Sequence, residues 1–217
     1  MKITLEEFKN KVPPHGIFNE APPKTPILRH DWESKQLYSV IDCLGKTCSV
    51  LDYGCGGKGT LQYTLFNHYP KAQYYGLDLT EEFFSDNKGF KEKENNNIHL
   101  LDIKELDNIL PKVDCMILGS VFTHLGLNSI TDILNKTLPY YSKGFQLGFT
   151  AFLGEEIIQY HKFKGDYWWI IILTTKWIKE YCNKHNLSFI VHPYVFELDH
   201  QIPLGLTHQN FITIKQK

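Results

Sequence analysis

Three glycines at fixed spacing mark the most informative part of the sequence. Gly54, Gly56 and Gly59 match the pattern G-x-G-x-x-G, between a short apolar run at residues 49–53 and a segment of helical character at residues 59–68. Glycine allows the positive φ angles of a tight turn after a strand, and it lets a ligand approach the bare backbone. Such a loop at the start of a helix is typical of sites for nucleotide-containing cofactors. Alone, the pattern fits several such cofactors and also a purely structural turn.

An acidic residue, Asp52, lies two positions before the first of these glycines. A dinucleotide would bring its pyrophosphate to this loop, where a nearby carboxylate would repel the phosphate charges. S-adenosylmethionine (SAM) instead carries a cationic amino group and a sulfonium, which a carboxylate attracts. The sequence therefore favours SAM over a nicotinamide dinucleotide. A structural turn with an unrelated Asp is the other alternative.

Two more carboxylates follow the next two predicted strands. Asp78 comes after residues 73–77, at about the distance where a carboxylate accepts two hydrogen bonds from a ribose diol. This contact suits SAM and NAD equally. Asp102 ends the run 98–101, where it is placed to accept a hydrogen bond from an adenine amino group. Each has a structural alternative, because Asp is also a common cap at the start of a helix.

These segments resemble the motifs of class I SAM-dependent methyltransferases. Residues 52–59 are similar to the first motif of that family, residues 76–78 to the second and residues 101–103 to the third. Residues 114–125 resemble the fourth strand and the loop after it. The match covers about residues 45–155, in the order and spacing of the family.

The resemblance implies SAM as the cofactor and the fold of that family. This fold is α/β and Rossmann-like, with a seven-stranded, mostly parallel sheet, one antiparallel strand and helices on both faces. It also implies that Leu79, Ile103 and Gly119 contact the cofactor, together with the glycines and carboxylates already named. Within the family, residues 119–125 look most like members that modify small molecules and glycans.

The wider pattern predicts the elements that position these loops. Short apolar runs alternate with segments of helical character, which is typical of a parallel sheet flanked by helices. The predicted strands are residues 49–53, 73–77, 98–101, 114–118, 145–152, 188–192 and 210–214. The predicted helices are residues 32–44, 59–68, 81–87, 103–109 and 128–138, and one that Thr175 caps and that runs to His185. Since no helix separates the last two strands, we expect an antiparallel hairpin at one edge of the sheet.

The length of 217 residues suits one domain, residues 1–217, with its own core. Prolines concentrate in residues 1–30, which we expect to form an extended arm or lid because proline interrupts helices. Residues 45–155 form the predicted SAM-binding core. Residues 156–217 supply the predicted acceptor side and the closing hairpin.

Composition narrows the partners and the compartment. The formal net charge is −1 and lysines form no dense cluster, so we expect no nucleic-acid partner. The sequence predicts neither a signal peptide nor a membrane span. The five cysteines contain no CxxC pair, which indicates reduced thiols in a cytoplasm. Arg29 is the only arginine, a bias typical of AT-rich bacterial genomes.

The fourth motif restricts the methyl acceptor. Family members that methylate nucleobase amines usually carry Asn/Asp-Pro-Pro-aromatic after the fourth strand, whereas residues 118–121 read Leu-Gly-Ser-Val. Base methylation is therefore disfavoured. No Asp-Asn pair follows Asp114 to supply oxygen ligands, so we expect no metal ion.

His124 is the candidate general base. A sugar hydroxyl is barely acidic, so its methylation needs a base as the new bond forms. His124 follows the fourth strand, beside the expected methyl group, and an unperturbed imidazole has a pKa of about 6.5. The alternative is that His124 only caps or packs against the next helix.

Further residues are candidates for the acceptor site. Aromatic side chains after the fifth strand, with Tyr167 and Trp168 among them, offer a face for a flat or sugar-like acceptor. The alternative is an apolar cover over the sheet. His208 and Gln209, with His200 and Gln201, offer polar contacts to hydroxyls. Arg29 precedes the first helix and suits a carboxylate or another anionic group, unless it is simply exposed to solvent.

The sequence thus predicts metal-independent methyl transfer from SAM to an oxygen of a small metabolite or glycan precursor, with nitrogen as the second choice. The alternatives are a carboxylate or protein acceptor, a SAM-binding partner protein without catalysis, and an NAD-dependent enzyme. The oligomeric state does not follow from the sequence.

Overall fold

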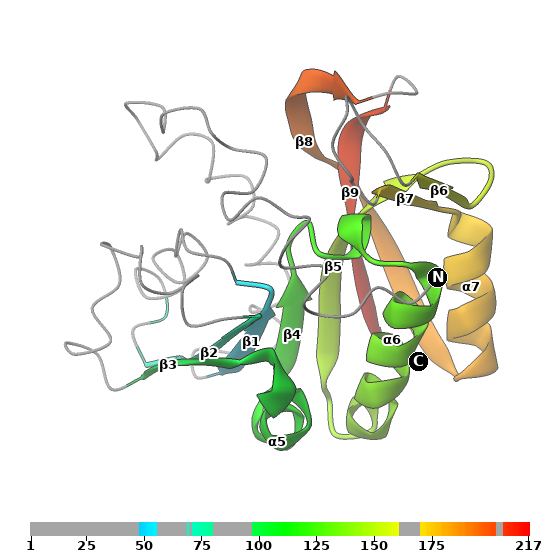
Figure 1. The fold of residues 1–217 in the computed structure, drawn as a ribbon. Coiled ribbons are helices and arrows are strands. Elements are labelled where there is room, and N and C mark those ends of the chain that lie inside the picture. Colours follow the sequence, from blue (N-terminus) through cyan, green and yellow to red (C-terminus); the bar gives the residue numbers. More distant parts are fainter. Residues whose placement is uncertain (1–47, 56–68, 70, 80–96, 161–169, 203–205) are drawn as a thin grey trace.

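The computed structural model describes residues 48–55, 69, 71–79, 97–160, 170–202 and 206–217. Its centre is a nine-stranded sheet with the path β3-β2-β1-β4-β5-β7-β6, in which β9 also pairs with β5 and β8 pairs with β9 (Figure 1). The strands are β1 Ser49–Tyr53, β2 Gln73–Asp78, β3 Ile98–Asp102, β4 Cys115–Leu118, β5 Gln146–Leu153, β6 Ile158–Tyr160, β7 Ile170–Leu173, β8 Leu187–Ile202 and β9 Leu206–Gln216.

The first five strands are parallel to one another. In this register Asp52 of β1 lies beside Gly76 of β2 on one side and Ile117 of β4 on the other. Asp78 of β2 lies beside Asp102 of β3. Because parallel strands end at the same edge, this register brings the three predicted carboxylates to the carboxyl edge of the sheet.

The predicted closing hairpin is present. β8 and β9 are antiparallel to each other, and β9 is also antiparallel to β5, so β9 lies between β5 and β8. The series β3-β2-β1-β4-β5-β9-β8 is therefore the expected seven-stranded sheet with one antiparallel strand. The prediction of a Rossmann-like α/β fold is confirmed.

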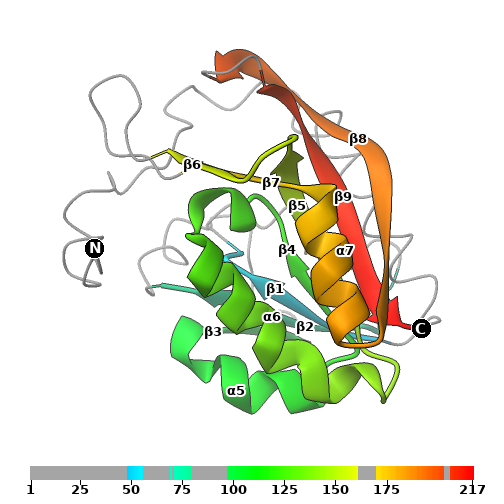
Figure 2. The same cartoon turned by 90° about the vertical axis from the view of Figure 1, so that its right-hand side faces the viewer.

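Two strands were not predicted. β6 and β7 form an antiparallel pair. β7 also pairs in parallel with the carboxyl end of β5, where Phe152 lies beside Ile172. Phe152 packs there with Ile170, Ile172 and Ile158 in a small apolar cluster of its own. Figure 2 shows this pair projecting from the sheet at the end where β5 finishes.

The described helices cover one face of the sheet. They are α5 Leu106–Ile109, α6 Leu127–Tyr141 and α7 Thr175–Lys184 (Figures 1 and 2), with the 3-10 turns η3 Ile103–Glu105, η4 Leu110–Lys112 and η5 Phe122–His124. They pack on the side chains of alternate strand residues, such as Leu51, Met116 and Phe149. The intervening residues form a second buried cluster on the opposite face. The predicted helices 32–44, 59–68 and 81–87, and the arm 1–30, lie outside the described residues.

The start of α7 differs from the sequence-based prediction by one residue. Thr174, and not Thr175, is the cap, because the Thr174 hydroxyl accepts a hydrogen bond from the Trp177 amide at 3.0 Å. Thr175 is the first residue of the helix. Sequence reasoning could not separate two adjacent threonines, since both are good caps.

Three core cysteines give a test of the burial of both faces. Cys48, Cys115 and Cys182 are no more than 4% exposed, and burial is the main reason that the pKa rises to about 11 for the Cys48 and Cys182 thiols. At pH 8 roughly one such thiol in a thousand is a thiolate, the reactive form. We therefore expect all three to resist Ellman's reagent in the native protein and to react promptly in guanidinium chloride.

The same thiols predict a loss of stability in alkali. Their pKa in the folded protein exceeds the ordinary value of 9.0, so the neutral form stabilises the fold fully below pH 9, and this contribution is lost as the pH rises through about 11.

Peptide mapping after labelling at pH 8 identifies which thiols react. Prompt labelling of Cys48 or Cys182 in the native protein would contradict the described core.

Candidate functional site

The glycine turn after β1 requires glycine at its first position. Gly54 has a φ of +73°. The Gly54 and Cys55 amides both donate to the Leu77 carbonyl, at 2.7 and 3.2 Å. A Cβ on Gly54 would lie 2.5 Å from Cγ2 of Val121, in the loop after β4. The turn therefore brings the ends of β1, β2 and β4 together. Gly56 and Gly59 lie outside the described residues.

Asp52 is held by a hydrogen bond from β2. Its side chain is 7% exposed, and its Oδ2 accepts a hydrogen bond from the hydroxyl of Tyr74 at 2.6 Å. A buried carboxylate needs such a donor, because burial removes the water that would otherwise stabilise its charge. The bond fixes the Asp52 carboxylate beside the glycine turn. Sequence reasoning missed Tyr74, which reads only as a strand residue.

Asp78 and the thiol of Cys55 share the space around Asp52. Burial is the main cause that raises the pKa of Cys55, and the negative charges of Asp52 and Asp78 raise it further. A Cβ on Gly76 would lie 2.9 Å from the Cys55 Sγ, so the thiol packs closely against β2 because residue 76 is glycine. Two carboxylates thus make the carboxyl ends of β1 and β2 electronegative, which favours a cationic ligand group.

Removal of the Tyr74 hydroxyl tests this arrangement. We expect Tyr74→Phe to lower the free energy of unfolding by about 1–2 kcal/mol, because it removes one charge-assisted hydrogen bond from a buried carboxylate. We also expect weaker SAM binding, since the Asp52 carboxylate is then less well oriented. Chemical denaturation and calorimetry measure the two effects.

Tyr75→Phe is the matched control. Tyr75 lies on the same strand, and its ring stacks on His99 with the ring centroids 4.8 Å apart. We expect little change in either measurement from this variant. Equal losses from the two variants would show that the Tyr74 hydroxyl has no special role.

Asp78 lies directly after the buried part of β2. It is 8% exposed, and its Oδ1 accepts a hydrogen bond from the Leu79 amide at 2.7 Å. Its charge also acts on Tyr53, whose pKa rises to about 12, mainly through burial and then through Asp78 and Asp107. Asp78 thus lies at the carboxyl edge of the sheet, as predicted. The helix that it was expected to cap as an alternative, residues 81–87, lies outside the described residues.

Asp102 has the capping role that sequence analysis gave as its alternative. Its Oδ1 accepts a hydrogen bond from the Lys104 amide at 2.9 Å, which caps the 3-10 turn that begins at Ile103. Its Oδ2 lies 3.8 Å from the Lys104 ammonium, and the Asp102 side chain is 43% exposed. The cap fixes the start of the loop after β3. The contacts of Asp102 and Ile103 with an adenine stay predictions.

The loop after β4 is held in an unusual conformation. Ser120 has a φ of 58°, which is uncommon for a residue other than glycine. Its amide donates to the Thr150 hydroxyl at 2.6 Å, its hydroxyl donates to Oε1 of Gln209 at 3.2 Å, and its carbonyl accepts from the Thr123 hydroxyl at 2.6 Å. These bonds to three elements offset the backbone strain, which is a common feature of functional sites. Sequence reasoning missed Ser120, Thr123 and Thr150.

Gly119 borders open space. A Cβ built on Gly119 meets no atom within 4 Å in the described part of the chain. The residue is exposed at the end of β4, next to the strained Ser120. A ligand can therefore approach the backbone here, as the sequence analysis expected of a cofactor contact.

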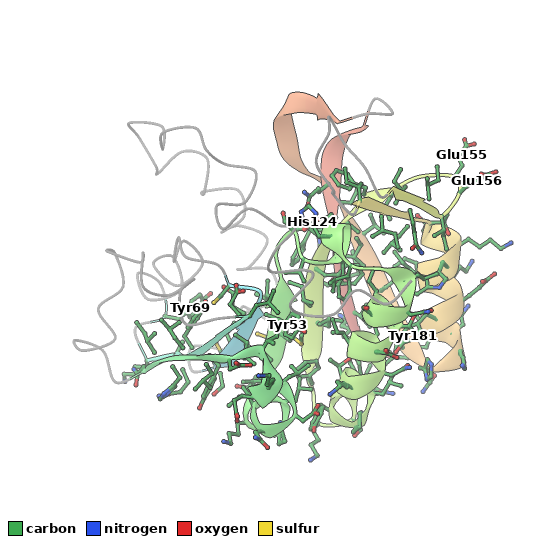
Figure 3. The ribbon with its side chains drawn as sticks, viewed as in Figure 1. Tyr53, Tyr69, His124, Glu155, Glu156 and Tyr181 are labelled. Carbon is green, nitrogen blue, oxygen red and sulfur yellow. The ribbon has the colours of Figure 1, made fainter. Side chains whose placement is uncertain are left out.

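His124 lies in η5, directly after this loop. Its amide donates to the Val121 carbonyl at 3.0 Å, and the residue is half-buried. Figure 3 shows His124 on the turn above β4 and β5, at the end of the sheet opposite to Tyr181 on α7. It does not cap the next helix: the N-cap of α6 is Gly126, with no side-chain cap. The base role stays a prediction.

Comparison with known families decides the class. A family model described as a methyltransferase domain matches residues 44–165, more than half of the chain. The chain belongs to this family. The identification as a class I SAM-dependent methyltransferase, made from the sequence motifs, is confirmed.

Solved structures share the fold of this methyltransferase at low sequence identity. One is the 1,6-didemethyltoxoflavin-N1-methyltransferase of Burkholderia thailandensis, with a TM-score of 0.62, 15% identity and coverage of 88% of this chain and 79% of that chain. Another is the magnesium protoporphyrin IX methyltransferase of Synechocystis PCC 6803, with a TM-score of 0.60, 13% identity and coverage of 87% and 79%. At such identities the likeness concerns the fold. A search of curated protein sequences finds no match.

The candidate acceptor residues of the methyltransferase are only partly described. Arg29, Tyr167 and Trp168 lie outside the described residues, and His208 is placed by its backbone in β9, opposite Glu197. No described helix is long and apolar enough to cross a membrane. Within the described ranges no group of three His, Cys, Asp or Glu side chains is arranged to hold a metal ion. Metal independence stays a prediction.

Proposed function

We propose that this methyltransferase transfers the methyl group of SAM to an oxygen of a small metabolite or glycan precursor, without a metal ion. The observation that carries the proposal is the joining of three features at the carboxyl edge of the sheet. These are the buried Asp52, the positive-φ turn at Gly54 and the open backbone at Gly119.

The described residues fit the cofactor. The electronegative ends of β1 and β2 suit the ammonium and sulfonium charges of SAM, and Asp78 at the end of β2 suits the ribose diol. Gly119 leaves the backbone free of a side chain where the cofactor can approach, and Gly54 lets the turn after β1 pack closely against Val121. Bound SAM supplies an activated methyl group, so the protein must chiefly bring the acceptor into line with it.

His124 supports oxygen as the target. A hydroxyl must lose its proton as the new bond forms, and an imidazole is the side chain best suited to accept it near neutral pH. His124 follows the Gly119–Val121 loop by a single 3-10 turn, which η5 provides. Transfer to an amine nitrogen is the second candidate, because a neutral amine needs less help from a base.

A small acceptor agrees with the charge and with the structural neighbours. The net charge of −1 gives no general attraction to a nucleic-acid backbone. Two of the neighbours are a 1,6-didemethyltoxoflavin-N1-methyltransferase and a magnesium protoporphyrin IX methyltransferase, both named for small molecules. The glycan assignment rests on the sequence resemblance of residues 119–125.

Two experiments test the proposal in order. Calorimetry of the purified protein with SAM, its product S-adenosylhomocysteine (SAH) and NAD is expected to show binding of the first two and not of NAD. Incubation with methyl-labelled SAM and a cell extract is then expected to place the label in a small-molecule fraction. Binding of NAD without SAM would overturn the proposal, and label only in protein or nucleic acid would refute the small acceptor.

A further inference from the structure

Two buried polar side chains beside the end of β4, Thr150 of β5 and Gln209 of β9, carry hydrogen-bond donors for which the described residues offer no acceptor. The Gln209 side chain is 5% exposed, and its Oε1 accepts from the Ser120 hydroxyl at 3.2 Å. Thr150 is 4% exposed, and its hydroxyl oxygen accepts from the Ser120 amide at 2.6 Å. In the described part of the chain no acceptor is found for the Gln209 amide N–H groups or for the Thr150 O–H.

These donors lie on one side of the sheet. Thr150 pairs with Phe211, and Gln209 is two residues from Phe211 along β9, so the side chains of Thr150 and Gln209 point to the same face. Both reach Ser120, which fixes their polar ends beside one another. The site therefore lies where β4, β5 and β9 meet.

The location suits the acceptor of the methyl group. Ser120 follows the open Gly119, and Val121 contacts the position of Gly54 in the glycine turn. The donors are thus next to the predicted cofactor site, on the side towards β5 and β9. In the strand order, β1 and β2 carry Asp52 and Asp78 on the other side of β4.

A purely structural role of Gln209 does not account for its side-chain amide N–H groups. Support of Ser120 in its left-handed conformation needs only an oxygen acceptor, which Oε1 provides. The amide nitrogen adds two donors on a side chain that is only 5% exposed, and buried donors without acceptors lower stability. A ligand that accepts hydrogen bonds would satisfy the Gln209 amide and the Thr150 hydroxyl together.

We propose that Gln209 and Thr150 form an anchoring subsite that binds a carboxylate or carbonyl oxygen of the methyl acceptor. The inference rests on the proposed function and adds the chemical class of the acceptor. The anchored oxygen is not the methylated atom, because hydrogen-bond donors withdraw electron density and make an oxygen a poorer nucleophile. The acceptor therefore carries at least two polar groups, one held by Gln209 and Thr150 and one that faces the methyl group.

Side-chain amide signals in nuclear magnetic resonance test the subsite directly. The full chain, ¹⁵N-labelled and saturated with SAH, is titrated with benzoate as a carboxylate probe and with benzylamine as a cationic control. We expect benzoate to shift the Gln209 amide signals and benzylamine to leave them unchanged. The signals are assigned by their loss in Gln209→Met.

Variants separate anchoring from folding. Gln209→Glu keeps an oxygen for the Ser120 hydroxyl but removes the amide donors. Thr150→Val removes the other donor together with the acceptor of the Ser120 amide, so chemical denaturation is used to measure its effect on stability. We expect each to weaken benzoate binding about tenfold or more, the usual effect of losing a hydrogen bond to a charged group. For Gln209→Glu, SAH binding by calorimetry is expected to stay within about twofold of the wild-type value, because an oxygen remains for the Ser120 hydroxyl. Gln146→Met, at the amino end of β5, is the control and should change neither.

The outcomes separate a failure of the proposed subsite from a failure of the proposed methyltransferase function. If SAH alone shifts the Gln209 signals and benzoate adds nothing, the donors serve the cofactor carboxylate and the inference is wrong. Benzoate binding that is absent in the wild type, or unchanged in both Gln209→Glu and Thr150→Val, also overturns it. Failure of the wild type to bind SAH, by contrast, refutes the proposed function. The benzoate titration is then repeated without SAH.

Discussion

Replacement of Gly54 with alanine is expected to lower SAM affinity by at least tenfold and to destabilise the fold by about 1–3 kcal/mol. Two physical effects act together. An alanine at a φ of +73° is strained, and its Cβ would lie 2.5 Å from Cγ2 of Val121. Relief of either effect must move the turn after β1 away from β4, which alters the backbone that faces the cofactor. Calorimetry with SAM and chemical denaturation measure the two losses.

A second change separates the two effects. In the double variant Gly54→Ala, Val121→Ala the contact with Cγ2 is removed, so we expect part of the stability and affinity to return while the φ strain persists. Gly126→Ala is the control, because Gly126 has a φ of −69° and a Cβ added there would lie 4.0 Å from the nearest atom, Oε1 of Gln159. If Gly54→Ala binds SAM as the wild type does, the turn is not the cofactor loop.

Replacement of His124 with alanine is expected to reduce the turnover number by about 10²- to 10⁴-fold, the usual contribution of a general base. SAM affinity should stay close to the wild-type value, because the proposed role of His124 is toward the acceptor. The wild-type rate should fall at acid pH, where protonation of the imidazole removes its ability to accept a proton. In His124→Ala this acid limb should flatten. The measurement is a pH profile of turnover with the acceptor found by label transfer.

His185→Ala provides the matched control. His185 follows α7, with its ring 4.7 Å from that of Tyr181, at the other end of the sheet from η5. We expect its turnover and pH profile to match those of the wild type. A turnover number for His124→Ala near the wild-type value, with SAM binding intact, would refute the base assignment and leave positioning of the acceptor as the source of catalysis.

The inner strands were predictable because a strand that is buried on both faces appears in the sequence as a run of apolar residues. β1 has the predicted bounds, and no bound of β2 to β5 differs from the predicted one by more than one residue. β1, β4 and β5 are buried on both faces, so each reads as a largely apolar run, whereas β3 is a half-buried edge strand. The positions of Asp52, Asp78 and Asp102 near the carboxyl ends of their strands could be predicted for this reason, while their contacts with the cofactor stay predictions.

The strands around the acceptor side were harder to predict. β6 has only three residues, and the apolar run of β7 does not show by periodicity whether it is strand or helix. β8 and β9 extend well beyond the predicted residues 188–192 and 210–214, through register shifts near Phe196 and Ile202. Such irregularities depend on the pairing of distant segments, which no local pattern records.

Parts of the site were equally beyond sequence reasoning. The left-handed Ser120 depends on hydrogen bonds that its amide and hydroxyl donate to Thr150 and Gln209, which are distant in sequence. A serine in a loop gives no sign of this. Tyr74 reads as an ordinary strand residue until the register places its hydroxyl on Asp52. Only the grouping of polar residues near Gln209 before the last strand gave a signal, and it did not single out the buried amide.

The place of β9 in the sheet governs when the protein can reach its native state. β9 completes the core by inserting between β5 and β8, with Ile212 and Ile214 buried against the helices. During synthesis on the ribosome β5 therefore emerges well before its partner β9. Until β9 emerges, the edge of β5 is exposed to chaperones or to other nascent chains. Contacts between such distant segments also slow folding. The sheet should consequently close only once residues 206–216 have left the ribosome, and the enzyme should be sensitive to disruption of these residues.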